Sequence, residues 1–440
     1  MNNIERLELA RWVAGQSKKA GADDASVTIA FSRDVNVDHR DRKIDNLTES
    51  TQNNLSLSIY LGGRFSNHTT CDLRRETLGG FIEQAVAMTK YLTPDPDRVI
   101  TDFRYCQGVE PRDLKLLDPA YERVTAEERV RFARECEDAA RAAAGDVVSC
   151  TGNYSDSYNE SVKVLTSGFE GERSGTNFSA YADVTLQDGS GVRVDDYEEG
   201  GGCYRGVMPS PDFLGRRAVE RTRARFGQIK MASGTYDMIV ANRTAGRMIG
   251  GITGALNGQS VYRKNSFLID KLEQKVFSEK LTIIDDPFLE SAFGSRLYDS
   301  DGMAAHRRVM VDKGVPKAYF IDWYYSRKLK MEPTSGGNSN LIYEYGTMSL
   351  EDMIRHTKKA IVVTSFVGGN SNGTTGDFSY GLIGQYVEDG KIVHPVNEMN
   401  VSGNFVTLWN NLVEMGNDPY LTSANRRPSL YFKDVSFAGL

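Results

Sequence analysis

The sequence predicts an α+β protein with an N-terminal α+β domain and a strand-rich C-terminal domain of mixed or antiparallel sheets. Alternating apolar and polar runs with turn residues between them are typical of antiparallel hairpins, as at Gly62-Gly63 and Asp389-Gly390. Helical segments lie among these runs without the strand–helix–strand rhythm of a doubly wound sheet. The chain of 440 residues is long enough for two or three domains.

Residues 1–100 form the first predicted unit, an α+β unit. It opens with a helix at about 3–20, because apolar residues recur near one face of that segment. Strands are predicted by the alternating stretches SVTIAF and NLSLSIYLGGRFSN. Asp72 is the expected cap of a second helix, which runs to about Tyr91.

Residues 101–228 form the second predicted unit, a helix followed by an antiparallel meander. A linker rich in proline and aspartate leads into it, TPDPDRVITDFRYCQGVEPRD. Thr125 and Glu128 have the spacing of a capping box that opens the helix. Short alternating runs between 147 and about 204 predict the strands of the meander, and a basic helix at about 212–226 closes the unit.

Residues 229–440 form the third predicted unit, which is rich in strands. A strand, TYDMIVA, precedes a glycine-rich helix at 246–260, which reads GRMIGGITGALNGQS. A hairpin turns at 312–314, and Ser349 caps a short helix before the strand AIVVTSFV. Another helix is expected near 404–415, before a last strand, SLYFKDVSF.

Composition and charge exclude several classes of protein. Lys and Arg number 53 against 59 Asp and Glu, a formal charge of -6, so nucleic acid is a disfavoured partner. No run approaches the roughly 18 apolar residues of a membrane span, and the start MNNIERLELARW has no signal-peptide core. The five cysteines are scattered and never form CxxC, which suits a reducing compartment, so we expect a cytoplasmic protein.

The glycine-rich helix is the most unusual feature, because glycine costs a helix interior roughly 1 kcal/mol relative to alanine. Its glycines recur every four residues, so their missing side chains would form a groove on one face. The groove admits two interpretations, a tight contact inside the domain or the approach of a partner or extended peptide. The predicted interface or peptide groove comprises Gly246, Gly250, Gly254, Gly258, Arg263 and Ser266.

Two other patterns suggest chemistry only weakly. Residues 369–373 match the GxSxG of a serine-hydrolase elbow around Ser371, but the following TTGDFSYGLIG predicts a turn and strand where the elbow requires a helix. The sequence GGNSN, at 336–340 and again at 368–372, favours polar loops. The acidic stretches at 285–287 and 298–302 could bind a cation, but their composition is typical of turns. The five histidines are too far apart for a local metal pair.

A series of motifs in the second half resembles one known family. SVYRKNSFLID (260–270) and LTIIDDP (281–287) are followed by LYDSDGM, YYSRKL, EPTSGGNSN, TGDFSYGLIGQYVEDGKIVHPV and VSGNFVTLWNNLVEMGND. Together they resemble the C-terminal half of the TldD/PmbA family, historically labelled modulators of DNA gyrase, over most of 235–420. The acidic balance gives no physical reason to expect contact with DNA.

The resemblance implies a choice between two branches of that family. The TldD branch is a zinc peptidase with an HExxxH helix and a later cysteine ligand, whereas the PmbA branch, also called TldE, lacks those ligands. Counted back from SVYRKNSFLID, the HExxxH register falls on Ile249, Gly250 and Gly254, and NDPYLTSANRRPSLYF near the C-terminus has no thiol. A zinc peptidase of that design needs three protein ligands and a general base. The chain therefore resembles the PmbA branch, and zinc is expected only in a partner subunit.

The function implied by the resemblance is that of a non-catalytic subunit in a metallopeptidase complex that encloses and degrades or processes unfolded peptides. Its expected partners are a TldD-like HExxxH subunit or a second copy of itself, and a peptide would lie as an added strand on a sheet edge. Two alternatives stay open. One is a stand-alone homodimer that binds peptides, and the other is a self-sufficient hydrolase that uses Ser371 or an unforeseen metal site.

Overall fold

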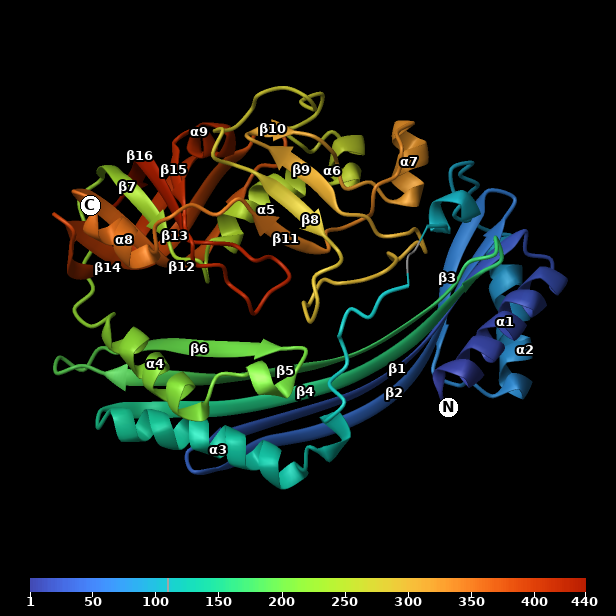
Figure 1. The fold of residues 1–440 in the computed structure, drawn as a ribbon, viewed down its shortest axis with the longest axis horizontal. Coiled ribbons are helices and arrows are strands. Elements are labelled where there is room, and N and C mark those ends of the chain that lie inside the picture. Colours follow the sequence, from blue (N-terminus) through green and yellow to red (C-terminus); the bar gives the residue numbers. More distant parts are fainter. Residues whose placement is uncertain (109–110) are drawn as a thin grey trace.

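The computed structural model describes residues 1–108 and 111–440, so two residues of the predicted linker lie outside the described residues. It confirms the α+β class, with two large sheets and one small sheet among helices. Figure 1 shows a long curved sheet from the first half of the chain, which holds the second half on its concave side.

The curved sheet has six antiparallel strands in the order β3-β2-β1-β4-β5-β6. Four of its strands have 17 to 19 residues, where strands of about five or six are usual, so the short runs predicted for the meander were wrong in length. The predicted domain boundary near residue 100 lies between β3 and β4 along the chain, and both strands belong to this one sheet. The strands are β1 Asp24–Arg40, β2 Lys43–Leu61, β3 Arg64–Thr70, β4 Val147–Leu165, β5 Glu170–Gln187 and β6 Arg193–Gly202.

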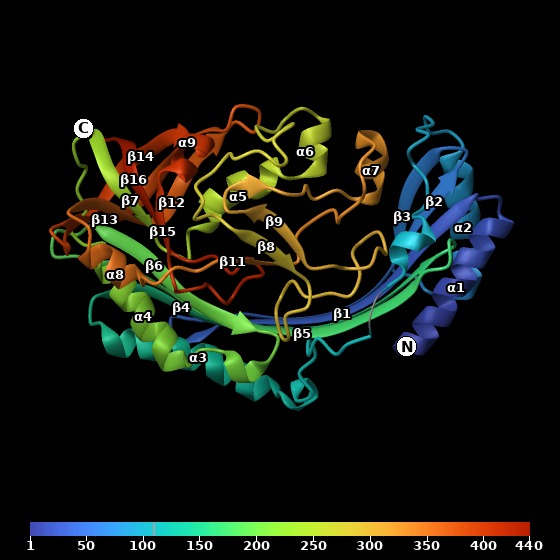
Figure 2. The same ribbon diagram turned by 45° about the horizontal axis from the view of Figure 1, so that its top comes forward.

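Four helices cover the convex face of the sheet (Figures 1 and 2). Two of them open with capping boxes, and the predicted box at Thr125 and Glu128 is confirmed. The predicted cap at Asp72 is wrong, because its carboxylate accepts a hydrogen bond from the Arg74 amide before the helix begins. The helices are α1 Asn3–Lys19, α2 Arg75–Thr89, α3 Ala126–Ala143 and α4 Pro211–Arg223.

A closed barrel forms the main sheet of the second half. Its order is β14-β13-β12-β7-β16, and pairing of β14 with β16 closes it, while β15 extends β16. β12 and β7 are parallel and the other pairs are antiparallel, which confirms the expected mixed sheet. The strands are β7 Gly234–Val240, β12 Lys359–Ser371, β13 Asp377–Glu388, β14 Lys391–Asn404, β15 Leu412–Met415 and β16 Leu430–Ala438.

A small antiparallel sheet, β10-β9-β8-β11, lies beside the barrel, and short helices surround both. The hairpin predicted at 312–314 joins β9 and β10, but the helix expected at 404–415 ends at Asn410, where β15 follows. The strands are β8 Ile283–Asp286, β9 Arg308–Asp312, β10 Val315–Pro316 and β11 Asn340–Tyr343. The helices are α5 Gly246–Ala255, α6 Gly258–Tyr262, α7 Trp323–Leu329, α8 Leu350–Arg355 and α9 Phe405–Asn410.

Polar contacts fasten the second half to both ends of the curved sheet. At the β3 end, Lys328 of α7 pairs with Asp95 at 2.8 Å, and the indole of Trp323 donates to the carbonyl of Val99. At the β6 end, Arg243 pairs with Asp196 at 3.1 Å. The second half is thus held across the concave face.

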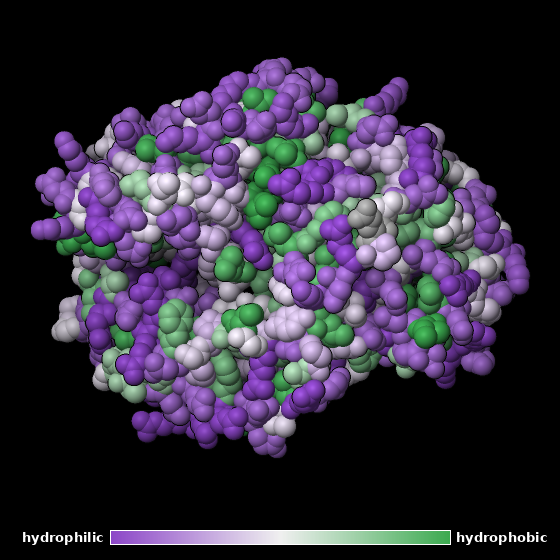
Figure 3. Space-filling model, viewed as in Figure 1, coloured by the Kyte–Doolittle hydropathy of each residue, from purple (hydrophilic) through white to green (hydrophobic). Residues whose placement is uncertain are grey.

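The surface shown in Figure 3 is mostly hydrophilic, with apolar residues in scattered patches. Within the described parts of the chain, no helix has both the length and the apolar character that crossing a bilayer requires.

Candidate functional site

The predicted glycine-rich helix is two helices. α5 ends at Ala255, and Asn257 caps α6 by accepting hydrogen bonds from the amides of Gln259 and Ser260. An asparagine side chain offers the backbone these alternative bonds and so favours a cap over a helix interior. The expected stripe of four glycines on one helix is therefore wrong, because Gly258 belongs to α6.

One face of α5 is part of the core of the second half. Met248, Ile249 and Ile252 are fully buried against barrel strands and against α9. Gly251 lies on this packed side, where an added Cβ would come within 2.3 Å of the Phe405 ring. Gly251, which is not one of the predicted groove residues, is thus the glycine of α5 that a tight internal contact requires.

The opposite face of α5 is bare. Gly250 and Gly254 are exposed, and an added Cβ at either position would have no atom within 4 Å. The two lie four residues apart and hence one above the other on the same face. No internal contact explains the small residue at these two positions.

The other predicted groove residues have different surroundings. Gly246 lies under the Arg427 side chain, and Gly258 is buried against the backbone at Phe320. Ser266 is buried, and its hydroxyl donates to the carbonyl of Ala255 at 2.6 Å, so it caps the end of α5 from inside the protein. Arg263 is exposed just after α6.

The residues of this helix do not fit a zinc ion. Ile249 and Gly254, at the two histidine positions of the HExxxH register, have no side-chain atom that could ligate a metal, and Gly250 has no carboxylate to act as a general base. Ile249 points into the core and Gly254 faces solvent. In residues 1–108 and 111–440 no group of three or more His, Cys, Asp and Glu could hold a metal ion.

Ser371 is the last residue of β12 and pairs with Phe378 of β13. A turn and a strand follow it, as the sequence predicts, so the strand-to-helix elbow of a serine hydrolase is not formed. The second GGNSN segment is therefore largely strand, with a bulge, and the prediction of a loop there was wrong. Arg247 ties this strand to α5 by donating to the carbonyls of Gly368 and Gly369 at 3.2 Å.

Carboxylates of both acidic stretches accept hydrogen bonds from backbone amides inside the protein. Asp285 accepts a hydrogen bond from the Ser339 amide at 2.5 Å, and burial raises the pKa of its carboxyl to about 6. Asp299 accepts from the amides of Asp301 and Met303 in a turn, and burial raises its pKa to about 6 as well. The turn predicted at 298–302 is thus correct, whereas the turn predicted at 285–287 was wrong for Asp285 and Asp286, which belong to strand β8.

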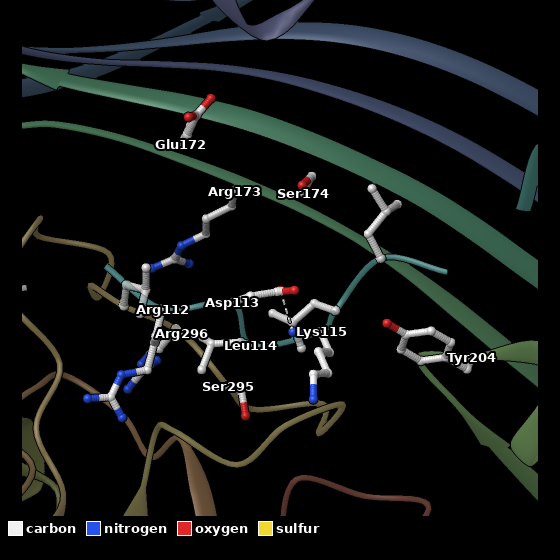
Figure 4. Close-up of a pocket in the computed structure, with 13 residues that line it drawn as sticks. Arg112, Asp113, Leu114, Lys115, Glu172, Arg173, Ser174, Tyr204, Ser295 and Arg296 are labelled. Carbon is white, nitrogen blue, oxygen red and sulfur yellow. Dashed lines mark hydrogen bonds between the residues drawn. The ribbon is translucent and has the colours of Figure 1, made fainter. Parts of the chain in front are cut away.

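A cavity of about 370 Å³ lies between the concave face of the curved sheet and the second half. Figure 4 shows Arg173 of β5, Arg112 and Arg296 along one side of it, from three separate segments of the chain. Leu114, Leu116, Leu117 and Leu297 add apolar walls. Sequence reasoning missed this site because its residues come together only through contacts between distant segments.

Comparison with known proteins identifies the family. Residues 119–226 match the PmbA/TldA metallopeptidase central domain, and residues 233–439 match the PmbA/TldA metallopeptidase C-terminal domain. The chain belongs to the PmbA/TldD family. The resemblance drawn from the motifs of the second half is thereby confirmed.

Relatives in the PmbA/TldD family match the chain along most of its length. Metalloprotease PmbA of Escherichia coli O157:H7 is 27% identical over 436 residues, which cover 98% of this chain and 96% of that protein. A candidate modulator of DNA gyrase from Bacteroides thetaiotaomicron has a solved structure that is 38% identical, covers all of both chains and superposes with a TM-score of 0.97. TldE from Thermococcus kodakarensis, 18% identical, shares the fold with a TM-score of 0.87 over 98% of this chain and all of that one.

The PmbA/TldD motifs meet at the C-terminal end of α5. Ser266, from SVYRKNSFLID, bonds to Ala255, and Asn265 of the same motif accepts a hydrogen bond from Thr374 in the segment before β13. The motifs therefore hold α5 with its bare face outward.

Proposed function

We propose that this chain is a non-catalytic subunit of a PmbA/TldD-type metallopeptidase complex that encloses and degrades or processes unfolded peptides. A partner with an HExxxH helix would supply the zinc ion and the general base. This chain would supply one wall of the enclosed space and the surface that the partner or its peptide approaches. We take the cytoplasm as its compartment, because its cysteines are unpaired thiols.

The observation that carries the proposal is the bare face of α5. Two glycines in a helix interior cost about 2 kcal/mol relative to two alanines. Gly250 and Gly254 have no neighbour inside the described chain that requires this cost. A helix without side chains on its outer face lets another backbone come unusually close, so the neighbour that explains the glycines would lie in another molecule.

Two other exposed helical glycines, Gly15 of α1 and Gly80 of α2, also have open space around their Cβ positions. They lie on different helices, so neither extends a bare patch as Gly250 and Gly254 do together. They provide matched controls for the experiment below.

One rival function would explain the bare face of α5 in another way, and a second would place a catalytic site at Ser371. A stand-alone homodimer would place the bare faces of two copies together and would capture peptides without cutting them. A hydrolase centred on Ser371 has less support, because no described histidine or carboxylate hydrogen-bonds to that serine and no helix follows it.

The test is to mix the purified chain with an HExxxH-bearing relative, measure the mass of the mixture by light scattering, and assay cleavage of casein. We expect a mixed complex and chelator-sensitive cleavage well above that of either chain alone. The variant Gly250→Leu/Gly254→Leu should lose pairing or activity with an unchanged circular dichroism spectrum, whereas Gly15→Leu/Gly80→Leu should behave as the wild type. A mixture no more active than the relative alone, or full function of the α5 variant, would overturn the proposal.

A further inference from the structure

The concave face of the curved sheet carries polar side chains in rows. Because directly paired residues of neighbouring strands point to the same face, the strand register defines these rows. The neighbouring apolar positions, such as Ile29 and Leu55, pack under α1 and α2 on the other face. One row across β2, β1, β4 and β5 is Asn54, Ala30, Ser161 and Arg173, and the next is Gln52, Ser32, Asn159 and Gly175.

Arg173 stands between two glycines on its own strand. At Gly171 an added Cβ would come within 2.6 Å of the Tyr298 ring, and at Gly175 it would come within 3.3 Å of the Leu116 carbonyl oxygen. The second half of the chain thus approaches the sheet backbone closely on both sides of Arg173. The arginine is the one long side chain that rises from β5 between these two walls.

Two cavities meet at this residue. One, of about 440 Å³, lies over the polar rows of β2, β1 and β4, and the other is the cavity of about 370 Å³ in Figure 4. Arg173, Ser174 and Leu116 line both. The two cavities therefore adjoin at Arg173, and together they are called the groove below.

The guanidinium of Arg173 has no ion-pair partner. It lies over the Tyr298 ring, 4.1 Å from the centroid, and among residues 1–108 and 111–440 no carboxylate oxygen lies within 4.0 Å of it. The neighbouring Glu172 points to the opposite face of the sheet (Figure 4). Desolvation on the floor of the cavity lowers the pKa of Arg173, although the side chain as a whole keeps contact with water, so an anion can reach its guanidinium.

Arg296 adds a second cation with spare hydrogen-bonding capacity. Its Nη2 donates to the Ser335 hydroxyl and to the Gly337 carbonyl, while its buried Nε has no partner. Guanidinium groups bind carboxylates through paired, charge-assisted hydrogen bonds. An anion in this cavity would give Arg173 the counterion that it lacks, with the positive charge of Arg296 nearby.

We propose that this groove binds an extended peptide and that Arg173, supported by Arg296, holds a carboxylate of that peptide. The amides and hydroxyls of the polar rows bond to the peptide backbone, and the leucines of the second cavity pack against its side chains. Three strand spacings of about 4.8 Å separate β2 from β5, so roughly four extended residues cross the polar rows before the chain reaches Arg173. The proposal rests on the proposed function only in taking a peptide as the ligand.

The test uses the purified chain alone and three fluorescein-labelled unstructured hexapeptides, with binding measured by fluorescence anisotropy at low salt. One peptide ends in leucine with a free carboxylate, the second is its neutral amide, and the third is an amide with one internal glutamate. We expect the free acid or the glutamate peptide to bind at least tenfold more tightly than the neutral amide, and the tighter of the two identifies the source of the carboxylate. Equal affinity for all three peptides, or no binding up to 1 mM, would refute the proposal without any variant.

Variants then assign the role of Arg173. Arg173→Gln should abolish the preference for the acid, and Arg173→Lys should keep only part of it, because lysine cannot form the paired hydrogen bonds. The matched control is Arg216→Gln, since Arg216 lies on α4 at the convex side and pairs with Asp212. Full preference for the acid in a folded Arg173→Gln variant would contradict the assignment. Pairing with an HExxxH relative is measured separately, so failure of the complex and failure of this site give different results.

Discussion

Replacing the two exposed glycines of α5 by alanine should stabilise the protein. Both positions have ordinary helical backbone and open space, so alanine fits without strain. Each substitution should contribute about 1 kcal/mol from helix propensity, or about 2 kcal/mol for Gly250→Ala/Gly254→Ala. For a unit of the size of the second half, each 1 kcal/mol corresponds to roughly 2 to 4 °C in Tm, so we expect a rise of about 4 to 8 °C in differential scanning calorimetry.

The control lies one residue away on the same helix. Gly251→Ala has the same gain in propensity, but its methyl group would meet the Phe405 ring at 2.3 Å, and overpacking of this kind costs about 1 to 3 kcal/mol. Its Tm should therefore fall or stay unchanged. A fall in Tm for the double variant, or equal effects at all three positions, would show that the surroundings of α5 have been misjudged.

The remaining predictions concern buried charges. Arg129→Met should destabilise the chain by about 3 to 5 kcal/mol in chemical denaturation, because it leaves Asp156 buried without the cation that now lies 2.6 Å away. The double variant Arg129→Met/Asp156→Asn should lose less free energy of unfolding than the two single variants lose in sum. Burial raises the pKa of Asp299 from an ordinary 3.8 to about 6, so the fold favours the neutral form of this carboxyl. The stabilisation from the neutral form is full below about pH 4 and is lost as the pH rises through 6. Between pH 4.5 and 7 the free energy of unfolding of the wild type should fall by on the order of 2 kcal/mol more than that of Asp299→Asn, and parallel pH profiles would contradict this.

Local signals in the sequence predicted local structure well. The capping boxes at Thr125 and Ser349 and the turns at Gly62 and Asp389 are confirmed, because each depends on a few neighbouring residues. The end of α5 at Ala255 was missed, although Asn257 is a good cap and could have indicated it. The spacing of the glycines alone predicted one helix over 246–260, whereas α5 ends at Ala255.

Features that depend on distant segments could not be predicted. The lengths of the curved strands and their union into one sheet follow from pairing between β1 and β4, more than a hundred residues apart. The environment of Arg173 requires this register and also the approach of Tyr298 and Leu116. The sequence pattern around Arg173 resembles that of any exposed strand residue, so the groove is visible only in the structure.

Ion pairs fix the position of the second half, which carries α5, relative to the curved sheet, which carries the groove. Contacts such as Lys328 with Asp95 and Arg243 with Asp196 hold the second half across the concave face, and they do so from both ends of the sheet. The cavity of about 370 Å³ thus lies between the two halves, while the bare face of α5 stays exposed.

The most direct test of the central claim is the zinc content and peptidase activity of this chain purified alone, measured by inductively coupled plasma mass spectrometry and by casein cleavage with and without chelator. We predict far less than one zinc ion per chain and no chelator-sensitive cleavage until an HExxxH-bearing partner is added. One zinc ion per chain together with chelator-sensitive cleavage by the chain alone would contradict it.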